Sequence, residues 1–488
     1  MKSSKKNRQA GVLLHISSLP MGVLGRYAYQ FVDFLSEVGV KVWQTLPLNM
    51  PHGDGSPYQC LSAHGGNPAF ISVQQLTEQG LLSTNDSEIY LANQSLDLKL
   101  KLIEKIFTSL DSQRDSSLYK DFKKFCRKHA FWLDDFVLFL LLRRQFKDLS
   151  WNLWPELYKT RDAKALNQIR KLYNDEIGVL KFTQFLFFRQ WEALKKYANK
   201  KGIAMFGDIP IFVAYDSADV WANPTLFKLD KRCNMKVVAG VPPDYFSETG
   251  QRWGNPHYNW RLMKADGFKW WLARMSTQND LFDMVRIDHF RGLEAAWEIS
   301  AKEDTAINGK WRRAPGAALL AAIKKHFPKM CLIAEDLGII TDAVNKLRAK
   351  FNLPGMKILQ FAFGGGDDNY YLPANIEANS VVYTGTHDND TTLGWYTTLH
   401  EHAKNHLHAL LENDTPDMPF DLVKMVLDTK ANLAIIPMQD ILELGAECRM
   451  NIPGTVENNW TWQFEWSQLT PALKTQFAQA VKSSRRAK

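Results

Sequence analysis

Two acidic side chains stand out because each directly follows a short apolar run. In residues 282–291 such a run contains Arg286 and ends at Asp288. Residues two apart on a strand point to the same face, so Arg286 is expected to lower the pKa of Asp288 and keep this carboxylate ionised. An ionised aspartate can act as a nucleophile, although the same pattern also fits a structural Arg–Asp pair at a strand end.

The second of these side chains is Glu335, which follows four apolar or small residues in the segment 331–338. Poor hydration at such a position should raise the pKa of Glu335 toward neutrality, as a general acid requires. The alternative is that Glu335 or Asp336 caps the start of a helix.

Two further segments place acidic residues after apolar runs. Residues 382–390 carry His387, Asp388 and Asp390 after a β-branched run, and residues 206–211 contain Asp208. Some of these side chains also suit turns. One ionised and one protonated carboxyl group on opposite sides of a bond are what glycosidic cleavage through an oxocarbenium-like state requires. Each motif is weak alone, but together they predict a cleft lined by acids.

The elements that must position these residues form a repeating pattern of short β-rich apolar runs, most of them followed by helical stretches. This pattern is typical of a parallel α/β architecture, and eight such units favour a closed (β/α)₈ TIM barrel. In such barrels the catalytic groups project from the C-terminal ends of the strands. The predicted strands are residues 11–17, 42–46, 203–209, 282–287, 330–334, 356–361, 380–383 and 433–436.

The spacing of the units predicts large insertions in a single catalytic barrel that spans residues 1–488. Residues 70–200 are mainly helical in pattern and should form an inserted subdomain, because a structureless loop of that length is uncommon. Residues 215–261 are rich in Pro, Gly, Asn and Trp and are expected to form a loop-rich lid over the active site. No run of strands follows the eighth unit, so a separate C-terminal β-sandwich domain is not expected.

Composition restricts the class of protein. A hydrophobic content of 45% and a charged content of 23% exclude a disordered chain. No apolar stretch is long enough for a membrane span or a signal peptide. Part of the net charge of +8 lies in two short tails, which argues against nucleic-acid binding. Five scattered cysteines without a CxxC pair indicate reduced thiols and a cytoplasmic protein, and no residues have convincing metal-ligand spacing.

The acidic segments resemble the signature regions of the α-amylase clan. The similarity is greatest to the 4-α-glucanotransferases of glycoside hydrolase family 77, also called amylomaltases or disproportionating enzymes, and it extends from about Gly11 to Trp466. The strings that carry it are residues 56–59, 208–213, 241–256, 285–292, 384–391 and 451–455.

The resemblance implies a role for each matching residue. Asp288 would be the nucleophile, Glu335 the acid/base, and Asp388 a third carboxylate that holds the distorted donor sugar, with Asp390 as a rival by spacing. The segment from Tyr245 to Trp253 would form the loop that arches over the cleft, with Trp253 as a platform on the acceptor side. The remaining residues implied to bind substrate are Tyr58, Asp208, Tyr245, Arg286 and His387.

The implied reaction is a retaining double displacement that transfers α-1,4-glucan segments between maltooligosaccharides or starch- and glycogen-derived glucans, with no metal or organic cofactor. It requires the two carboxyl groups to lie about 5–5.5 Å apart. One rival is an α-amylase-type hydrolase, in which water is the acceptor, and another is a non-catalytic glucan-binding scaffold. The sequence departs from the family at residues 62–68, near His64 and Gly65, and at residues 150–155, which leaves acceptor preference open.

Overall fold

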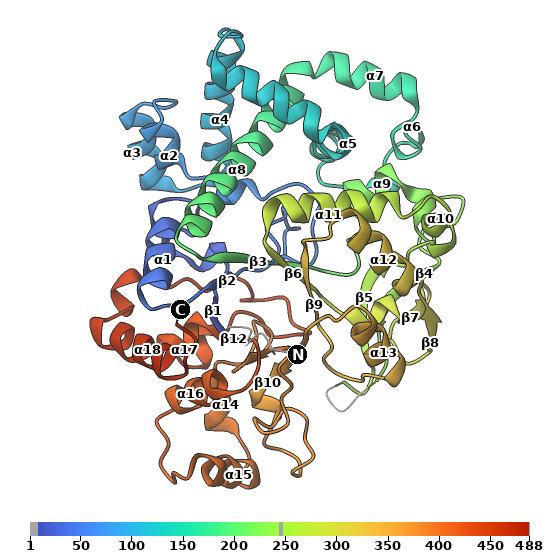
Figure 1. The fold of residues 1–488 in the computed structure, drawn as a ribbon. Coiled ribbons are helices and arrows are strands. Elements are labelled where there is room, and N and C mark those ends of the chain that lie inside the picture. Colours follow the sequence, from blue (N-terminus) through green and yellow to red (C-terminus); the bar gives the residue numbers. More distant parts are fainter. Residues whose placement is uncertain (1–7, 244–246, 488) are drawn as a thin grey trace.

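Eight parallel strands form the central sheet of the computed structural model, which describes residues 8–243 and 247–487. Their order is β10-β11-β12-β1-β2-β3-β6-β9, and β9 and β10 close the ring through Ala334, whose N–H donates to the Pro354 carbonyl at 2.9 Å. The predicted (β/α)₈ barrel is therefore confirmed (Figure 1). The strands are β1 (Gln9–Leu13), β2 (Val42–Gln44), β3 (Ala204–Ile209), β6 (Met284–Ile287), β9 (Cys331–Ala334), β10 (Gly355–Ile358), β11 (Ser380–Tyr383) and β12 (Leu433–Pro437).

The barrel strands form where they do because most of their residues are apolar, on both faces of the sheet. Every residue of β2, β11 and β12 is buried, as expected for parallel strands that are covered by helices outside and by packed side chains inside. The barrel interior is a packed core and not a pore. Its members include Leu13, Val42, Phe206, Ile333, Met356, Tyr383 and Ile435.

Helices cover the outside of the barrel and pack on it through apolar faces. The predicted helices at residues 27–37, 314–326 and 341–350 correspond to α1, α12 and α13. The bounds are α1 (Arg26–Glu37), α9 (Ala218–Ala222), α10 (Trp260–Ala265), α11 (Lys269–Leu281), α12 (Gly316–His326), α13 (Asp342–Lys350), α14 (Thr392–Thr398), α15 (Glu401–Leu411), α16 (Phe420–Asp428), α17 (Met438–Ile441) and α18 (Pro471–Ser483).

Seven helices lie between β2 and β3 and gather at one end of the molecule (Figure 1). The long helices α5 and α8 pack on each other through phenylalanine rings, and α8 continues to the barrel, where the Trp191 indole donates to the Leu281 carbonyl at 2.8 Å. The seven helices are α2 (Val73–Glu78), α3 (Thr84–Asn93), α4 (Leu96–Asp111), α5 (Ser117–Gln145), α6 (Glu156–Lys159), α7 (Ala163–Leu172) and α8 (Asn174–Lys200).

The segment 62–68, singled out in the sequence, lies where these helices meet the barrel. His64 is buried, stacks on Trp132 of α5 with ring centroids 5.8 Å apart, and contacts Thr277 of α11 at 2.8 Å. The backbone of Gly66 pairs with the side-chain amide of Gln184 on α8. The Gly66 N–H donates to Gln184 Oε1 at 2.8 Å, and Gln184 Nε2 donates to the Gly66 carbonyl at 3.0 Å. A β-carbon at Gly65 would lie 2.2 Å from the Phe136 ring. Small residues here therefore match the large aromatic side chains of the opposing helices.

Gly66→Ala is expected to destabilise the protein, because the added β-carbon would lie 2.1 Å from the ring of Phe187, which is fully buried. Overpacking of this kind costs about 1–3 kcal/mol. Chemical denaturation of the variant beside Gly364→Ala provides the measurement, since a β-carbon at Gly364 meets nothing within 4 Å. Equal free energies of unfolding for the two variants would contradict this packing.

A second, antiparallel sheet lies beside the barrel and was not predicted. Its order is β5-β4-β7-β8, and it joins strands from before and after β6. Two of its strands lie inside the stretch 215–261, which the sequence patterns indicate only as loop. The polar β5, with its Gly and Pro, lacks the apolar alternation of a typical strand. The bounds are β4 (Val237–Val241), β5 (Gln251–Pro256), β7 (Ala295–Ser300) and β8 (Gly309–Arg313).

Candidate active site

The C-terminal ends of β3, β6 and β9 and the loop after β11 open into one cleft of about 730 Å³. Three of the predicted acidic residues, Asp288, Glu335 and Asp388, line this cleft. The tertiary structure thus brings together carboxyl groups up to 100 positions apart in the chain. The other predicted residues that line the cleft are Tyr58 and Trp253.

Arg286 lies below the cleft and joins two of the predicted acids. Its guanidinium donates to Asp208 Oδ2 at 2.5 Å and to Asp288 Oδ1 at 2.8 Å. Arg286 and Asp208 are almost fully buried, so their charges are balanced by each other and not by water. Tyr58 donates its hydroxyl to the same Asp208 oxygen at 2.8 Å. Asp208 therefore holds both Arg286 and Tyr58 in place.

The pKa of Asp288 differs from the sequence expectation. Burial raises it to about 6, and the positive charge of Arg286 offsets only part of that rise. The negative charges of Asp208 and Asp388 act in the same direction as burial. Arg286 lowers the pKa of Asp288, as expected from the sequence, but burial outweighs this effect and the net shift of the pKa is upward. The carboxylate is still mainly ionised at pH 7.

Glu335 has the environment that the sequence predicts for a general acid. Burial raises its pKa to about 7; Arg286 lowers the pKa and the negative charge of Asp288 raises it. Its two carboxyl oxygens accept backbone N–H groups from His289 at 2.6 Å and Leu337 at 2.8 Å, which hold the carboxyl group in one orientation. Neither Glu335 nor Asp336 caps a helix, because α13 begins after Thr341.

Asp388 stands at the side of the cleft, and its pKa is held well below the usual value. Burial would raise this pKa, but the His387 ring, 3.2 Å from Oδ2, and the Asn451 amide, which donates to Oδ1 at 2.6 Å, outweigh it. Asp388 is therefore ionised over the whole range in which Asp288 and Glu335 titrate. Such a group can accept hydrogen bonds from sugar hydroxyls at any working pH.

Arg449 fixes the backbone around Asp388. Its guanidinium donates to the carbonyl of Asp388 at 2.6 Å and to that of Asn451 at 2.7 Å. It therefore ties the loop after β11 to the segment that follows β12. The sequence patterns indicate no role for Arg449, and Asn451 appears only inside the family-like string 451–455. A charged residue whose side chain forms hydrogen bonds with backbone carbonyls has no sequence signature.

Arg449→Ala is expected to lower kcat/KM by up to about 100-fold, because a displacement of about 1 Å in a side chain of the cleft can cost that much activity. Arg449→Lys should recover little, since a single ammonium cannot span two carbonyls as a planar guanidinium does. Steady-state kinetics beside thermal unfolding test this. Full activity in the alanine variant would show that Asp388 needs no such support.

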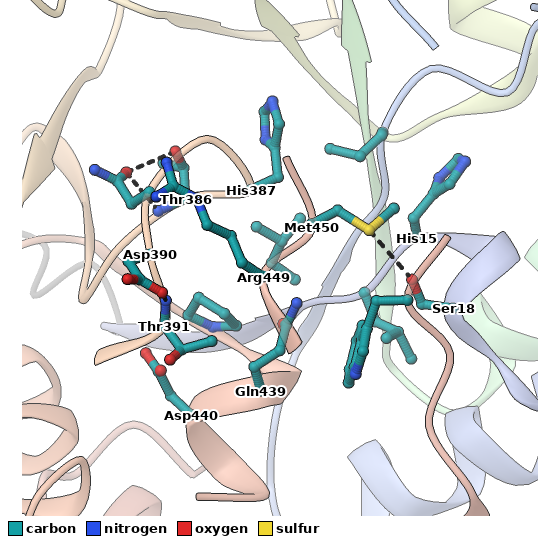
Figure 2. A pocket seen from close by; sticks show the side chains of 16 residues that line it. His15, Ser18, Thr386, His387, Asp390, Thr391, Gln439, Asp440, Arg449 and Met450 are labelled. Atoms are coloured by element: carbon teal, nitrogen blue, oxygen red, sulfur yellow. Dashed lines mark hydrogen bonds between the residues drawn. The ribbon is translucent and has the colours of Figure 1, made fainter. Parts of the chain in front are cut away.

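Tyr58 forms the wall of the cleft next to Arg286, and His387, which lines a separate cavity, packs against Tyr58. The Tyr58 hydroxyl lies 2.8 Å from His387 Nε2, and the two rings stack at 5.3 Å. Trp460, which sequence reasoning missed, lines the same wall 5.9 Å from the Tyr58 ring. Asp390 instead lines a smaller, separate cavity. Figure 2 shows Asp390, Thr391 and Asp440 on one side of this cavity, with His15 and Ser18 on the other.

The opposite side of the cleft is formed by β5. Trp253 lies edge-on against the ring of His289, with centroids 4.8 Å apart, and so contacts the residue that directly follows Asp288. Tyr245, predicted to bind substrate from the same segment, lies outside the described residues. Within the described ranges 8–243 and 247–487, no cluster of three or more His, Cys, Asp or Glu side chains is arranged to hold a metal ion. No helix in these ranges is long and apolar enough to cross a membrane.

Fold and cleft together define a (β/α)₈-barrel enzyme with a pair of carboxyl groups at the C-terminal ends of adjacent strands. Comparison with known proteins gives the family. The family model described as 4-alpha-glucanotransferase, glycoside hydrolase family 77, matches residues 13–470. The chain therefore belongs to this family.

Individual relatives agree with this. A 4-alpha-glucanotransferase of Thermus thermophilus is 45% identical over 481 residues, covering 95% of this chain and 96% of the relative. The chloroplastic/amyloplastic 4-alpha-glucanotransferase of Solanum tuberosum is 42% identical, and the matched region covers 93% of this chain and 82% of the relative. The amylomaltase of Streptococcus agalactiae, solved in complex with acarbose, superposes with a TM-score of 0.92 at 34% identity, covering 99% of this chain and all of that one.

Proposed function

We propose that Asp288, Glu335 and Asp388 carry out the transfer of α-1,4-glucan segments from a maltooligosaccharide donor to the 4-hydroxyl of glucose or another glucan. The observation that supports this best is the pair of carboxyl groups that directly follow the adjacent strands β6 and β9, with pKa values of about 6 and 7 in one cleft. At neutral pH one of them is mainly ionised and the other is still partly protonated. This is the division that a retaining mechanism needs.

In the first step Asp288 attacks C1 of the donor sugar while Glu335 protonates the departing glycosidic oxygen. Only Oδ1 of Asp288 is hydrogen bonded within the described part of the chain, to Arg286, so Oδ2 is available to form the bond to C1. The carboxylate of Asp388 then accepts hydrogen bonds from hydroxyls of the distorted sugar. Because Arg286 and Asp388 are already held in place, little reorganisation accompanies the charge that develops.

In the second step the 4-hydroxyl of the acceptor attacks C1, Glu335 takes the proton of that hydroxyl, and the bond between C1 and Asp288 breaks. The product keeps the α configuration. We propose that residues 215–261, with β4 and β5, limit the access of water to the covalent intermediate, with Trp253 as the acceptor-side platform. Exclusion of water of this kind favours transfer over hydrolysis.

The pH dependence of kcat/KM should be bell-shaped, with its maximum between about pH 6 and 7. Asp288 must be deprotonated, so activity falls as the pH drops below its pKa of about 6. Glu335 must be protonated, so activity falls as the pH rises above its pKa of about 7. The two limbs belong to the coupled pair. Initial rates with maltotriose across pH 4–9 measure them, and a flat profile between pH 5 and 9 would contradict this assignment.

The products formed from maltotriose distinguish transfer from its main rival. A transferase yields glucose and longer oligomers at a constant number of reducing ends, whereas an α-amylase-type hydrolase raises that number. Chromatography of the products together with a reducing-end assay therefore tests the proposal. A rise of the reducing-end count in step with maltotriose loss would favour the hydrolase.

A cytoplasmic location is proposed on the state of the cysteines. No disulfide joins any of the five, all of which lie in the described part of the chain. Scattered thiols of this kind are typical of a reducing compartment. The substrates proposed are maltooligosaccharides and glucans derived from starch or glycogen, without nucleic acid.

A further inference from the structure

A second groove lies on the outside of the barrel, and none of its lining residues lines the catalytic cleft. It has a volume of about 1040 Å³ and lies between α1, α2, α8 and the 3-10 turn η9 (Trp466–Gln468). We call it the outer groove. The lining residues that matter here are Tyr27, Tyr29, Gln30, Gln79, Arg189 and Trp466.

Aromatic rings form one part of the outer groove. The rings of Tyr27 and Trp466 are nearly parallel, at 29°, with centroids 6.4 Å apart, and both side chains are partly exposed. The ring of Tyr29 is also partly exposed. Aromatic rings combine a large apolar surface with a polar edge, and such surfaces suit the C–H faces of sugar rings.

Planar polar groups form another part of the outer groove. Gln30, Gln79 and Arg189 are exposed, and within the described residues none of their side chains has a hydrogen bond or ion pair. Amide and guanidinium groups offer several donors in one plane, which matches neighbouring hydroxyls of a sugar.

The charges in the outer groove favour a neutral ligand. The lining holds two guanidinium groups, Arg26 and Arg189, and two carboxylates, Asp33 and Glu78, which are equal in number. Lys201 lies outside the lining and adds one positive charge where it pairs with Asp33 at 2.8 Å. A polyanion would meet two carboxylates here, and a cationic peptide would meet two guanidinium groups. A neutral ligand rich in hydroxyls is repelled by neither the carboxylates nor the guanidinium groups.

The chain links the outer groove to the catalytic cleft through alternating aromatic residues. Trp460 lines the cleft and Trp466 lines the outer groove, with Trp462 and Phe464 between them. Phe464 lies 6.4 Å from Trp462 and 5.7 Å from Trp466, measured between ring centroids. Six residues span at most about 20 Å, so the two sites lie within the reach of a single ligand of several sugar units.

We propose that the outer groove binds a non-reacting part of a long α-1,4-glucan whose reacting part occupies the catalytic cleft. The proposal rests on the glucan transfer proposed above. A polymer held at the outer groove has a raised effective concentration at the cleft, whereas maltotriose is too short to gain from it. The outer groove would therefore give the enzyme a preference for long chains.

Two variants test the outer groove. Tyr27→Ala removes a ring, and the double variant Gln79→Ala/Arg189→Ala removes exposed donors without opening the core. The matched control is Phe131→Ala, which removes an aromatic side chain that is 53% exposed on α5, away from the outer groove. Affinity electrophoresis in gels containing glycogen gives the dissociation constant, and kinetics give the ratio of kcat/KM for amylose to that for maltotriose.

Both variants should raise the dissociation constant for glycogen at least about threefold and lower the kinetic ratio by a similar factor, as expected for the loss of one aromatic or hydrogen-bonding contact. Phe131→Ala should change neither value. Unchanged glycogen binding in either variant overturns the outer groove as a glucan site. Failure of the proposed function looks different: the unmodified protein would then not transfer glucose units from maltotriose, whatever its affinity for glycogen.

Discussion

Asp288→Asn is expected to lower kcat for maltotriose transfer by about 10⁴-fold or more, because covalent catalysis has no substitute for its nucleophile. Asn keeps the size of the side chain and can still accept the hydrogen bond that Arg286 donates at 2.8 Å, so the cleft should keep its shape. The loss should therefore appear in kcat and much less in the affinity for maltooligosaccharides. Steady-state kinetics together with calorimetric binding measure the two effects.

A matched variant controls for charge alone. Asp54→Asn removes a carboxylate from the exposed rim of the same cleft and should leave kcat close to that of the unmodified protein. Substantial turnover in Asp288→Asn, beyond what contaminating unmodified protein explains, would refute the nucleophile assignment. A non-catalytic glucan-binding scaffold would lose only affinity in this variant and would have no turnover to lose.

Glu335→Gln is expected to lower kcat with maltooligosaccharide donors by about 10²–10⁴-fold, the usual contribution of a general acid/base. The first step should recover with α-maltosyl fluoride, because fluoride departs without a proton. The alkaline limb of the pH profile near pH 7 should disappear at the same time, since the titrating group is gone. Single-turnover rates with the two donors across pH measure both effects.

The comparison of the two donors also distinguishes the roles of Asp288 and Glu335. Asp288→Asn should remain inactive with α-maltosyl fluoride, because a good leaving group does not replace a nucleophile. If Glu335→Gln lost the same activity with both donors, its role would be structural. The Glu335 carboxyl group accepts hydrogen bonds from two backbone N–H groups, so the substitution can also change stability. Thermal unfolding of the variant is therefore measured together with the kinetics.

Much of the barrel could be predicted because its strands are short, apolar and regularly followed by helices. Parallel strands that are buried on both faces have few polar positions, so β11 and β12 are visible in the sequence almost to the residue. β5 was missed because its polar residues form a strand only through pairing with β4. Its conformation depends on a partner strand and not on its own pattern.

The acids of the site could be predicted for a related reason. Asp288 and Glu335 follow apolar runs, and the C-terminal ends of parallel strands meet at one end of a barrel. Arg449 and Trp460 carry no comparable signal. The contacts of Arg449 are carbonyl oxygens, which every residue possesses, so its role depends entirely on which loops lie next to it.

The sequence by itself determined the barrel, the acids at its strand ends and, through the strings that resemble the family, the kind of reaction. The tertiary structure decided the electrostatic state of these acids. Arg286 lies two residues from Asp288, yet burial outweighs its charge and brings the pKa of Asp288 to about 6. The structure also decided that Asp388 faces the cleft while Asp390 does not. Both depend on distances and on exclusion of water between residues far apart in the chain, which local sequence does not contain.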